Sequence, residues 1–473
     1  MKLNLYKRSA VVLTTILLVS TTACRKQLYQ EPVDAISPAT AFSSPDRAEK
    51  AALGMYDQLQ NINFFGGRVL IYVDVRGTDV NPPSYFNPLP QFVTVSSSES
   101  FTAGAWQGAY RTIGECNLFL KSVASSTGIP QSKLDQYTGE AKFIRSLCYF
   151  YLVNMFAQPY NFTAGATHLG VPLVLSYSSS PFDPSNQIPR SSVAAVYNQM
   201  ENDLLDAENK LPLNYGDPTF YDVARATRGA ARALLARLYL YKGDYAKANT
   251  YADKIINTAA PDNYTMNPDP LTTFRTFTTR ESIFSVAMNG ADNPNTNNAL
   301  GQHYNPDKRG DIQVSNEYVS LMDQAVDLRF KNLIRTQGGS YWTSKYIGTN
   351  DWVPVFRYPE ILLIKAEALA NLSAAIADPI AIGLVNSVRA RSHAAPVAPL
   401  TKADLITAIL NERRIELGFE GQGEFDYLRT GRGIPAHSII TAQAYGSNYV
   451  ILPIPKYETD KSPILKQQQN PGY

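Results

Sequence analysis

The sequence predicts a mostly α-helical protein in which tetratricopeptide-like helix pairs form a scaffold for a large, irregular, loop-rich region. Residues 225–257 have the length and apolar spacing of one helix–turn–helix repeat. Long segments rich in Pro, Ser, Asn and Gly separate the predicted helices. Strands do not alternate regularly with helices, so a doubly wound sheet is excluded.

The amino terminus has the layout of a secretory signal. Three basic residues precede an uncharged run at residues 9–23 that ends just before Cys24. This run is shorter than the roughly 20 residues of a spanning helix, and no later apolar stretch of about 18 residues occurs. We predict a signal peptide at residues 1–23 and lipidation of Cys24, because Thr21-Thr22-Ala23-Cys24 resembles a bacterial lipobox. Thr21 stands where Leu is usual, and an ordinary signal peptide with an incidental cysteine is the alternative.

Composition excludes several partners. The formal net charge is +2 and no Lys/Arg-rich run occurs, so nucleic acid is not expected as a partner. The four histidines lie far apart and no metal-binding motif is present, so we expect neither a metal nor a cofactor. Cys116 and Cys148 fall in predicted helices, and we expect free, buried thiols there, with a disulfide as the alternative.

The block at residues 225–257 is the clearest repeat. Gly243 is placed to end its first helix, and Asp244 is placed to cap its second. The two helices of one repeat cannot bury their apolar faces alone, so companion pairs are expected. These are residues 47–59 with 110–123, 139–156 with 193–210, and 359–371 with 380–391.

Residues 357–370, RYPEILLIKAEALA, resemble the signature of the SusD/RagB family of Bacteroidetes lipoproteins. Further matches follow the family order along nearly the whole chain, and together they make the resemblance specific. They are DLR at 327–329, NSVRAR at 386–391, NERRIEL at 411–417, FDYLRTG at 425–431, LPIP at 452–455 and QNPGY at 469–473.

The resemblance implies a cell-surface glycan- or nutrient-binding lipoprotein that sits as a lid over a SusC-like TonB-dependent transporter in the outer membrane. It implies one SusD-like domain over residues 24–473, largely helical, beside a loop-rich region that holds the ligand. Its parts would be an N-terminal part at about 24–210, tetratricopeptide-like helices including 225–258 and 359–392, and a C-terminal SusD/RagB region at about 260–473.

Carboxylates cluster at residues 412–429, where a glycosidase would need two of them about 5 to 10 Å apart around a cleft. Interspersed arginines lower carboxylate pKa values and pair them off. We therefore expect structural ion pairs that tie a helix to its following turn. No Gly-x-Ser-x-Gly elbow or Walker loop occurs, so a binding protein rather than an enzyme is expected.

Sugar binding requires exposed aromatic faces near polar groups that bond hydroxyls. Residues 61–92, residues 289–305 and the segment with Tyr341, Trp342 and Trp352 offer this mixture. For every residue chosen, core packing or a structural turn is the competing interpretation, and residues 341–346 also fit a buried strand. The predicted ligand-binding residues are Asp79, Tyr85, Phe86, Asn87, Tyr304, Tyr341 and Trp342.

These observations favour capture of oligosaccharides for delivery to a partner transporter. A peptide ligand, as in the RagB branch, is the first alternative, because near-neutral charge and Tyr-rich loops do not separate peptides from sugars. The second is a tetratricopeptide scaffold that binds another protein through its concave face and has no small ligand.

Overall fold

The computed structural model describes residues 42–180, 183–260, 262–374 and 376–473. The predicted signal peptide at residues 1–23 and the predicted lipidation site Cys24 lie outside the described residues. Within them the protein is mostly helical, as predicted, and the sheets there have only two strands each. No helix of the described part is long and apolar enough to cross a bilayer.

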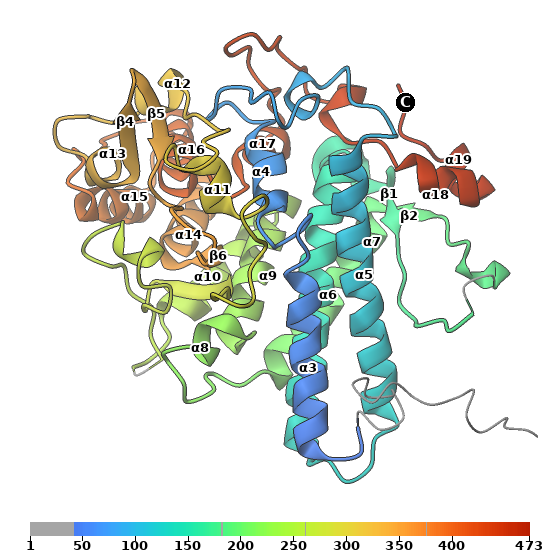
Figure 1. Ribbon diagram of the computed structural model, residues 1–473. Coiled ribbons are helices and arrows are strands. Elements are labelled where there is room, and N and C mark those ends of the chain that lie inside the picture. The colour runs from blue at the N-terminus through green and yellow to red at the C-terminus, as the bar shows by residue number, and fades with distance from the viewer. Residues whose placement is uncertain (1–41, 181–182, 261, 375) are drawn as a thin grey trace, which may run out of the picture.

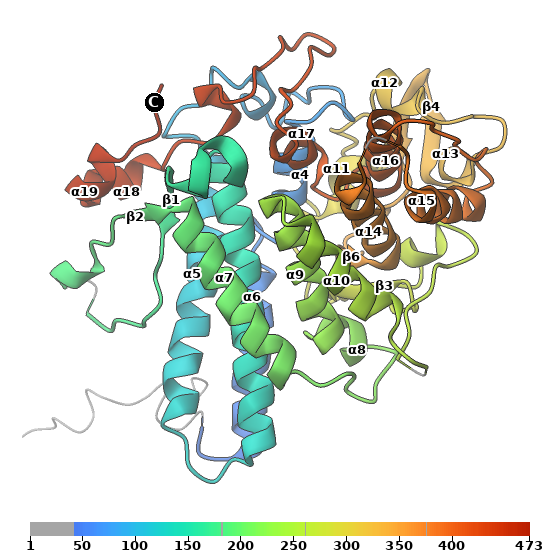
Figure 2. The ribbon, with the colours of Figure 1, turned by 180° about the vertical axis from the view of Figure 1, so that it is seen from behind.

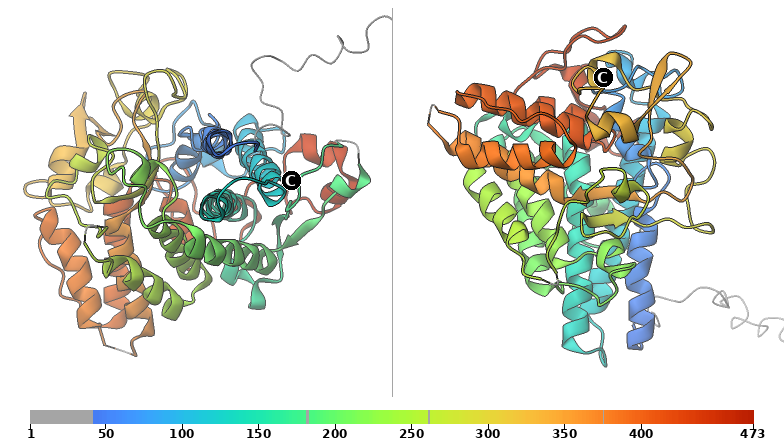
Figure 3. Two further views of the ribbon diagram at one scale, coloured as in Figure 1. Left: turned by 90° about the horizontal axis from the view of Figure 1, so that it is seen from below. Right: turned by 90° about the vertical axis from the view of Figure 1, so that its left-hand side faces the viewer.

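The longer helices pack side by side in a continuous array from α3 to α16 (Figures 1 and 2). Figure 3 shows the later helices of the array stacked beside one another in its right-hand view. These helices are α3 (Pro45–Leu59), α5 (Ser100–Ala124), α6 (Gln131–Phe156), α7 (Val193–Lys210), α9 (Arg228–Lys242), α10 (Tyr245–Ile256), α14 (Tyr358–Leu372), α15 (Pro379–Arg391) and α16 (Lys402–Leu417).

The predicted helix pairs are present and pack as expected. They are α3 with α5, α6 with α7, α9 with α10, and α14 with α15, and the arrangement is consistent with a tetratricopeptide-like stack. Between α9 and α10, Gly243 adopts the left-handed conformation with φ of 71°. The Asp244 carboxylate then accepts a hydrogen bond from the Lys247 backbone N–H at 3.1 Å. Both helix-end signals are therefore confirmed.

Helices α5 and α6 begin several residues before the predicted starts at residues 110 and 139. In α5, glycines that suggest a break lie inside the helix, where they let a neighbouring loop approach closely. A Cβ at Gly104 would lie 2.7 Å from the Asn63 side chain, and a Cβ at Gly108 would lie 3.0 Å from Phe64 Cβ. These glycines serve packing, which local propensity does not register.

Cys116 and Cys148 are free and fully buried, which confirms the prediction of buried thiols. Trp106 is also buried in the core and is only 2% exposed. Its indole N–H donates to Glu458 Oε1 at 3.3 Å. These residues belong to the main apolar core between the long helices.

Shorter elements occupy the loop-rich side and the edges of the array (Figure 1). The strands form three antiparallel pairs, β1 with β2, β3 with β6, and β4 with β5. The strands are β1 (Leu169–Pro172), β2 (Arg190–Ser192), β3 (Ser282–Val286), β4 (Ile334–Gln337), β5 (Ser340–Thr343) and β6 (Val353–Arg357). The short α-helices are α4 (Arg68–Asp74), α8 (Tyr221–Ala224), α11 (Leu300–Tyr304), α12 (Asn316–Val319), α13 (Leu328–Leu333), α17 (Gly423–Arg429), α18 (Lys456–Lys461) and α19 (Pro463–Gln467).

The β1–β2 pair is joined to the last residues of the chain. The Arg190 guanidinium donates to Gly170 O at 2.7 Å, to Gln468 O at 2.7 Å and to Asn470 Oδ1 at 2.8 Å. The Asn470 amide in turn donates to Phe156 O at 2.8 Å, at the end of α6. Segments from both halves of the sequence are thus joined through one buried arginine.

Candidate ligand-binding site

Backbone hydrogen bonds join the first and third predicted loop regions through residues 313–314, which follow the second region. Val314 forms isolated antiparallel bridges with Val80 on one side and with Tyr341 on the other. The Val314 N–H donates to Tyr341 O at 2.8 Å, and the Asn81 N–H donates to Gln313 O at 2.8 Å. The loop after α4, the segment after α11 and strand β5 therefore form one continuous region, near the top of the view in Figure 1.

Tyr85 is an exposed aromatic residue in this region. Its side chain is 36% exposed, and its hydroxyl accepts a hydrogen bond from Arg68 Nη2 at 3.0 Å. The Tyr85 ring stacks on the His303 imidazole, with centroids 5.5 Å apart and an interplanar angle of 30°. The Arg309 guanidinium carbon lies 4.2 Å from the same ring centroid. These contacts hold the Tyr85 ring in one orientation at the surface.

His303 links this ring to a charged pair beneath it. Burial lowers the pKa of His303 below its usual value near 6.5, so the imidazole is neutral at pH 7. His303 Nδ1 lies 2.7 Å from Asp311 Oδ2, which also accepts from Arg309 Nε at 2.7 Å. Burial raises the pKa of Asp311, but the hydrogen bonds from His303 and Arg309 outweigh this effect and hold the pKa below its usual value. Asp311 is therefore ionised and accepts a hydrogen bond from His303 Nδ1–H, which leaves His303 Nε2 as a buried acceptor with no partner among the described residues.

Polar side chains surround the Tyr85 ring. Asn87 is exposed in the same turn, and Asn297 is exposed on the loop before α11. Arg309 Nη1 donates to Asn297 Oδ1 at 3.5 Å, so this amide lies beside the guanidinium that contacts Tyr85. An exposed ring with a guanidinium and carboxamides at its edge can stack on the apolar face of a pyranose and bond its hydroxyls.

Phe86 and Tyr304 do not fit the predicted role. Both side chains are 0% exposed, so neither offers a ring face to a ligand in this structure. Phe86 packs against Phe101 in the core, with centroids 5.1 Å apart. The Tyr304 hydroxyl donates to Asp74 Oδ2 at 2.7 Å, and burial raises the pKa of Asp74 to about 8. Their competing interpretation, core packing, describes both residues.

The other predicted residues divide between structural and surface positions. Asp79 is 5% exposed and pairs with Arg414, whose Nε donates to its Oδ1. Trp342 is 9% exposed, and its indole N–H donates to Gly310 O at 3.4 Å, which fits the buried-strand alternative. Tyr341 is half-buried on β5. Only Tyr85 and Asn87, of the seven predicted residues, are exposed.

Arg68, His303 and Arg309 are part of this site but are not among the seven predicted residues. Arg68 and His303 lie inside the predicted loop regions, where an arginine or histidine near an exposed tyrosine is a usable signal. Arg309 lies four residues beyond the predicted 289–305 loop, within Asp307-Lys308-Arg309-Gly310. Its polar turn composition is the only local indication that the binding region continues there.

The carboxylates of the 412–429 run are buried in ion pairs, as predicted. Glu416 pairs with Arg391 at 2.6 Å, and Glu420 pairs with Arg357 at 2.7 Å. Burial raises the pKa of Glu416, but the neighbouring arginines outweigh it and hold the pKa well below its usual value. These pairs tie α16 and the turn after it to distant segments, while Arg413 with Asp426 ties α16 to the segment after its turn, as expected. Since both carboxylates are at most 5% exposed, neither lines an open catalytic cleft.

Metal binding has no structural support in the described ranges. Within them, no group of three or more His, Cys, Asp and Glu side chains is arranged to hold an ion. The site around Tyr85 instead offers a ring face, guanidinium groups and amides, which are groups for recognising neutral polar ligands.

A family model described as the SusD family matches residues 236–473, half of the chain. The chain belongs to the SusD/RagB family. A second model, described as starch-binding and associating with the outer membrane, matches residues 84–240 of this SusD-family chain. Together the two matches cover residues 84–473, which include the helix array from α5 on and Tyr85 itself.

Known SusD-like proteins resemble the chain over almost its full length. SusD-like protein P2 of Formosa agariphila is 23% identical, over 98% of this chain and 99% of that protein. The crystal structure of a SusD superfamily protein from Bacteroides fragilis superposes with a TM-score of 0.78 and 28% identity, over 89% of this chain and 99% of that one. A laminarin-binding SusD-like protein superposes with a TM-score of 0.72 and 23% identity, over 91% of this chain and all of that one. These likenesses confirm the predicted SusD-like fold.

Proposed function

We propose that this protein captures glycans at the bacterial outer membrane through the surface around Tyr85. The observation that carries the proposal is the exposed Tyr85 ring, held by His303 and Arg309 and bordered by exposed amides. Membership of a family whose matching model is described as starch-binding supports a glycan ligand. The laminarin-binding relative of the same fold also supports it.

The proposed mode of binding is stacking with peripheral hydrogen bonds. One pyranose ring lies against Tyr85, and Arg309 with Asn297 bonds its hydroxyls. An open surface of this kind buries little area, so we expect modest affinity with preference set by ring geometry.

Calorimetric titration of the chain from residue 25 on tests this proposal. The panel comprises maltooligosaccharides, laminarin oligosaccharides and short peptides. We expect one sugar class to bind without hydrolysis, and Tyr85→Ala to weaken its binding about fivefold to tenfold, since an aromatic stacking contact contributes about 1 kcal/mol. Binding of peptides alone would favour the RagB-type alternative, and silence across the whole panel would favour the scaffold alternative.

Tyr177→Ala provides a matched control, because Tyr177 is also 36% exposed but lies on the segment between β1 and β2. We expect it to leave the titration unchanged. Tyr85→Phe keeps the ring and loses only the hydroxyl that accepts from Arg68, so it should retain most of the affinity. Equal losses in Tyr85→Ala and Tyr177→Ala would count against the proposed surface.

The same proposal includes anchorage and delivery. A signal peptide at residues 1–23 is removed, acyl chains on Cys24 hold the protein on the outer membrane facing outward, and a SusC-like TonB-dependent transporter takes over the bound glycan. Metabolic labelling with a fatty acid should label the native chain and not Cys24→Ser. Deletion of the partner barrel should abolish uptake while cells still bind the glycan at their surface.

The proposed role is binding without catalysis. Two of the carboxylates that a glycosidase reading would use, Glu416 and Glu420, are held ionised by buried cations, and neither faces open solvent. Incubation with the bound oligosaccharide should leave its length unchanged. Turnover that falls when Glu416, Glu420 or Glu424 is replaced by Gln would contradict this part of the proposal.

A further inference from the structure

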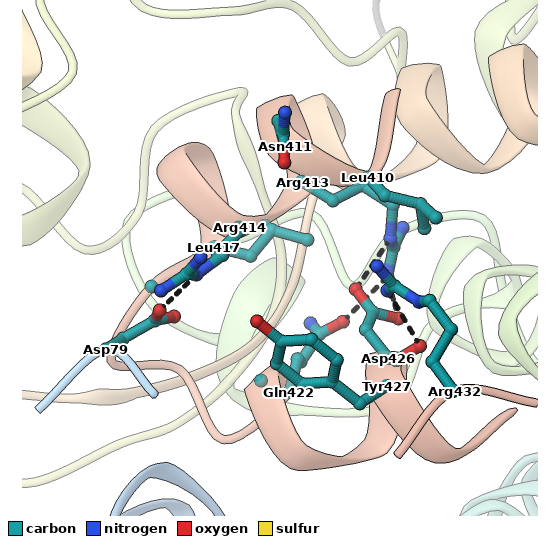
Figure 4. Close-up of a pocket in the computed structure, with 12 residues that line it drawn as sticks. Asp79, Leu410, Asn411, Arg413, Arg414, Leu417, Gln422, Asp426, Tyr427 and Arg432 are labelled. Atoms are coloured by element: carbon teal, nitrogen blue, oxygen red, sulfur yellow. Dashed lines mark hydrogen bonds and ion pairs between the residues drawn. The ribbon is translucent and has the colours of Figure 1, made fainter. Parts of the chain in front are cut away.

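A cleft lies between α16, α17 and the loop that carries Asp79 (Figure 4). Figure 4 shows the Tyr427 ring between two charged groups, the Arg414–Asp79 pair on one side and Arg413 with Asp426 and Arg432 on the other. This cleft is distinct from the surface around Tyr85, whose ring contacts do not include any of its lining residues.

Arg413 is fully buried yet incompletely bonded. Its Nε donates to Asp426 Oδ2 at 2.9 Å, and its Nη2 donates to Gln422 Oε1 at 3.1 Å. Its Nη1 is buried and finds no acceptor among the described residues. Leaving a buried charged donor without an acceptor costs free energy, and a hydrogen bond to an oxygen from outside the protein would remove this cost.

Arg414 repeats this pattern on the other side of Tyr427. Its Nε donates to Asp79 Oδ1, while its Nη2 is buried without an acceptor in the described part of the chain. Two neighbouring arginines of α16 therefore line the cleft, and each has one buried nitrogen without an acceptor in the described part of the chain.

The charge and the volume of the cleft limit which ligands can bind in it. Three arginines and two aspartates line the cleft, so its formal charge is +1. Water would satisfy the hydrogen bonds but leave this charge uncompensated, whereas an oxyanion satisfies both. The free volume of about 30 Å³ is roughly twice what one water molecule requires, which suits a carboxylate or sulfate group and excludes a whole sugar ring.

We propose that the cleft lined by Arg413, Arg414 and Arg432 is an anion-binding site for a small oxyanion, a carboxylate or sulfate group. The group belongs either to a free ion or to an acidic sugar such as a uronate. The unsatisfied Nη groups donate to its oxygens, and Arg432 contributes charge from the rim, where its guanidinium lies 4.8 Å from the Tyr427 ring centroid. The site does not depend on the glycan-binding role of the Tyr85 surface.

Thermal unfolding and calorimetry of the purified chain test this proposal with sodium sulfate, sodium glucuronate and sodium chloride at constant ionic strength. We expect saturable binding of sulfate or glucuronate that chloride does not reproduce. Tighter binding of sulfate identifies a free ion as the source, and tighter binding of glucuronate identifies an acidic sugar. Absence of saturable binding by both would overturn the proposal.

Variants locate the binding. Arg414→Lys keeps the charge opposite Asp79 but removes the unsatisfied nitrogen, and Arg432→Gln removes an exposed rim charge with little risk to the fold. Each should weaken anion binding about tenfold. Arg335→Gln, at an exposed arginine paired with Asp307 outside the cleft, is the matched control and should bind like the native chain. Unchanged binding in both cleft variants would also overturn the proposal.

Discussion

Replacing Arg357 with Met tests whether the buried ion network stabilises the junction between β6 and α16. The Arg357 guanidinium is 2% exposed and bonds Glu420 at 2.7 and 2.8 Å, Glu281 at 2.8 Å and Glu416 at 3.2 Å. Met fills a similar volume but leaves these carboxylates with fewer counter-charges. Breaking a buried pair in this way costs about 3 to 5 kcal/mol.

The same magnitude can be expressed as a shift in melting temperature. Unfolding entropy is about 2.1 cal/mol/K per residue, so a domain of roughly 430 residues has about 0.9 kcal/mol/K. The Arg357→Met variant should therefore melt about 3 to 6 °C lower. Urea unfolding should show the loss as a lower midpoint with an unchanged slope.

The loss should depend on pH in a defined direction. Although burial raises the pKa values of Glu416 and Glu420, their neighbouring cations hold both values below the usual 4.5. Groups with depressed pKa values contribute stability above the unfolded-state pKa, and this contribution is lost as pH falls. The difference between native and Arg357→Met proteins should thus be largest above about pH 4.5 and shrink in acid.

Arg335→Met is the control, because Arg335 pairs with Asp307 on the surface, with both side chains at least 40% exposed. It should cost less than about 1 kcal/mol. If Arg357→Met also cost less than about 1 kcal/mol at pH 7, the reasoning that this network is a dry, mutually dependent set of charges would be refuted.

Three further perturbations have defined outcomes. Tyr304→Phe removes the donor to buried Asp74 and should lower the free energy of unfolding by about 1 to 3 kcal/mol in urea titration. Glycan binding should persist. Lost binding with unchanged stability would reverse the assignment of Tyr304 to the core. Burial alone would raise the pKa of Asp426, but its arginine partners hold this pKa at about 2. Asp426→Asn should therefore remove about 2 kcal/mol of stability at pH 6, and the difference from the native protein should shrink as pH falls from about 4 to 2. Unfolding measured as a function of pH would reveal or contradict this dependence. Gly301→Ala places a Cβ against the Gly348 backbone, closer than van der Waals contact allows. Calorimetric melting should therefore show a destabilisation of at least about 1 kcal/mol. Gly383→Ala is the control and should show no such loss, because the space around Gly383 is open.

The helix scaffold could be predicted because its signals are local. Gly243 and Asp244 act within one turn of the chain, and the apolar spacing of each helix needs no knowledge of its partner. Family motifs then supplied the expected fold for the segments between the helices. Propensity failed where a residue serves a distant contact, as at Gly104 in α5.

The binding surface could be predicted only as a region. Tyr85 and Phe86 are adjacent and similar in character, yet one is 36% exposed and the other 0%. An irregular loop has no periodicity that assigns one of them to the inside. Ion-pair partners are equally hidden, because Arg76 and Glu424 are 348 residues apart. The pairing of charged residues is therefore set by the tertiary structure and not by the local sequence.

The long-range contacts of Arg190 affect the order in which parts of the chain can fold during synthesis. Its hydrogen-bond partners include Gln468, 278 residues later, and Asn470 reaches back to Phe156 across 314 residues. Closing such long loops is slow, because the chain loses conformational entropy before the contact forms. During synthesis, the Arg190 N–H and Nη1 groups therefore lack their acceptors until residues 468–470 have been made. A chain halted shortly before that point should remain sensitive to protease at the β1–β2 segment, however well its helices have formed.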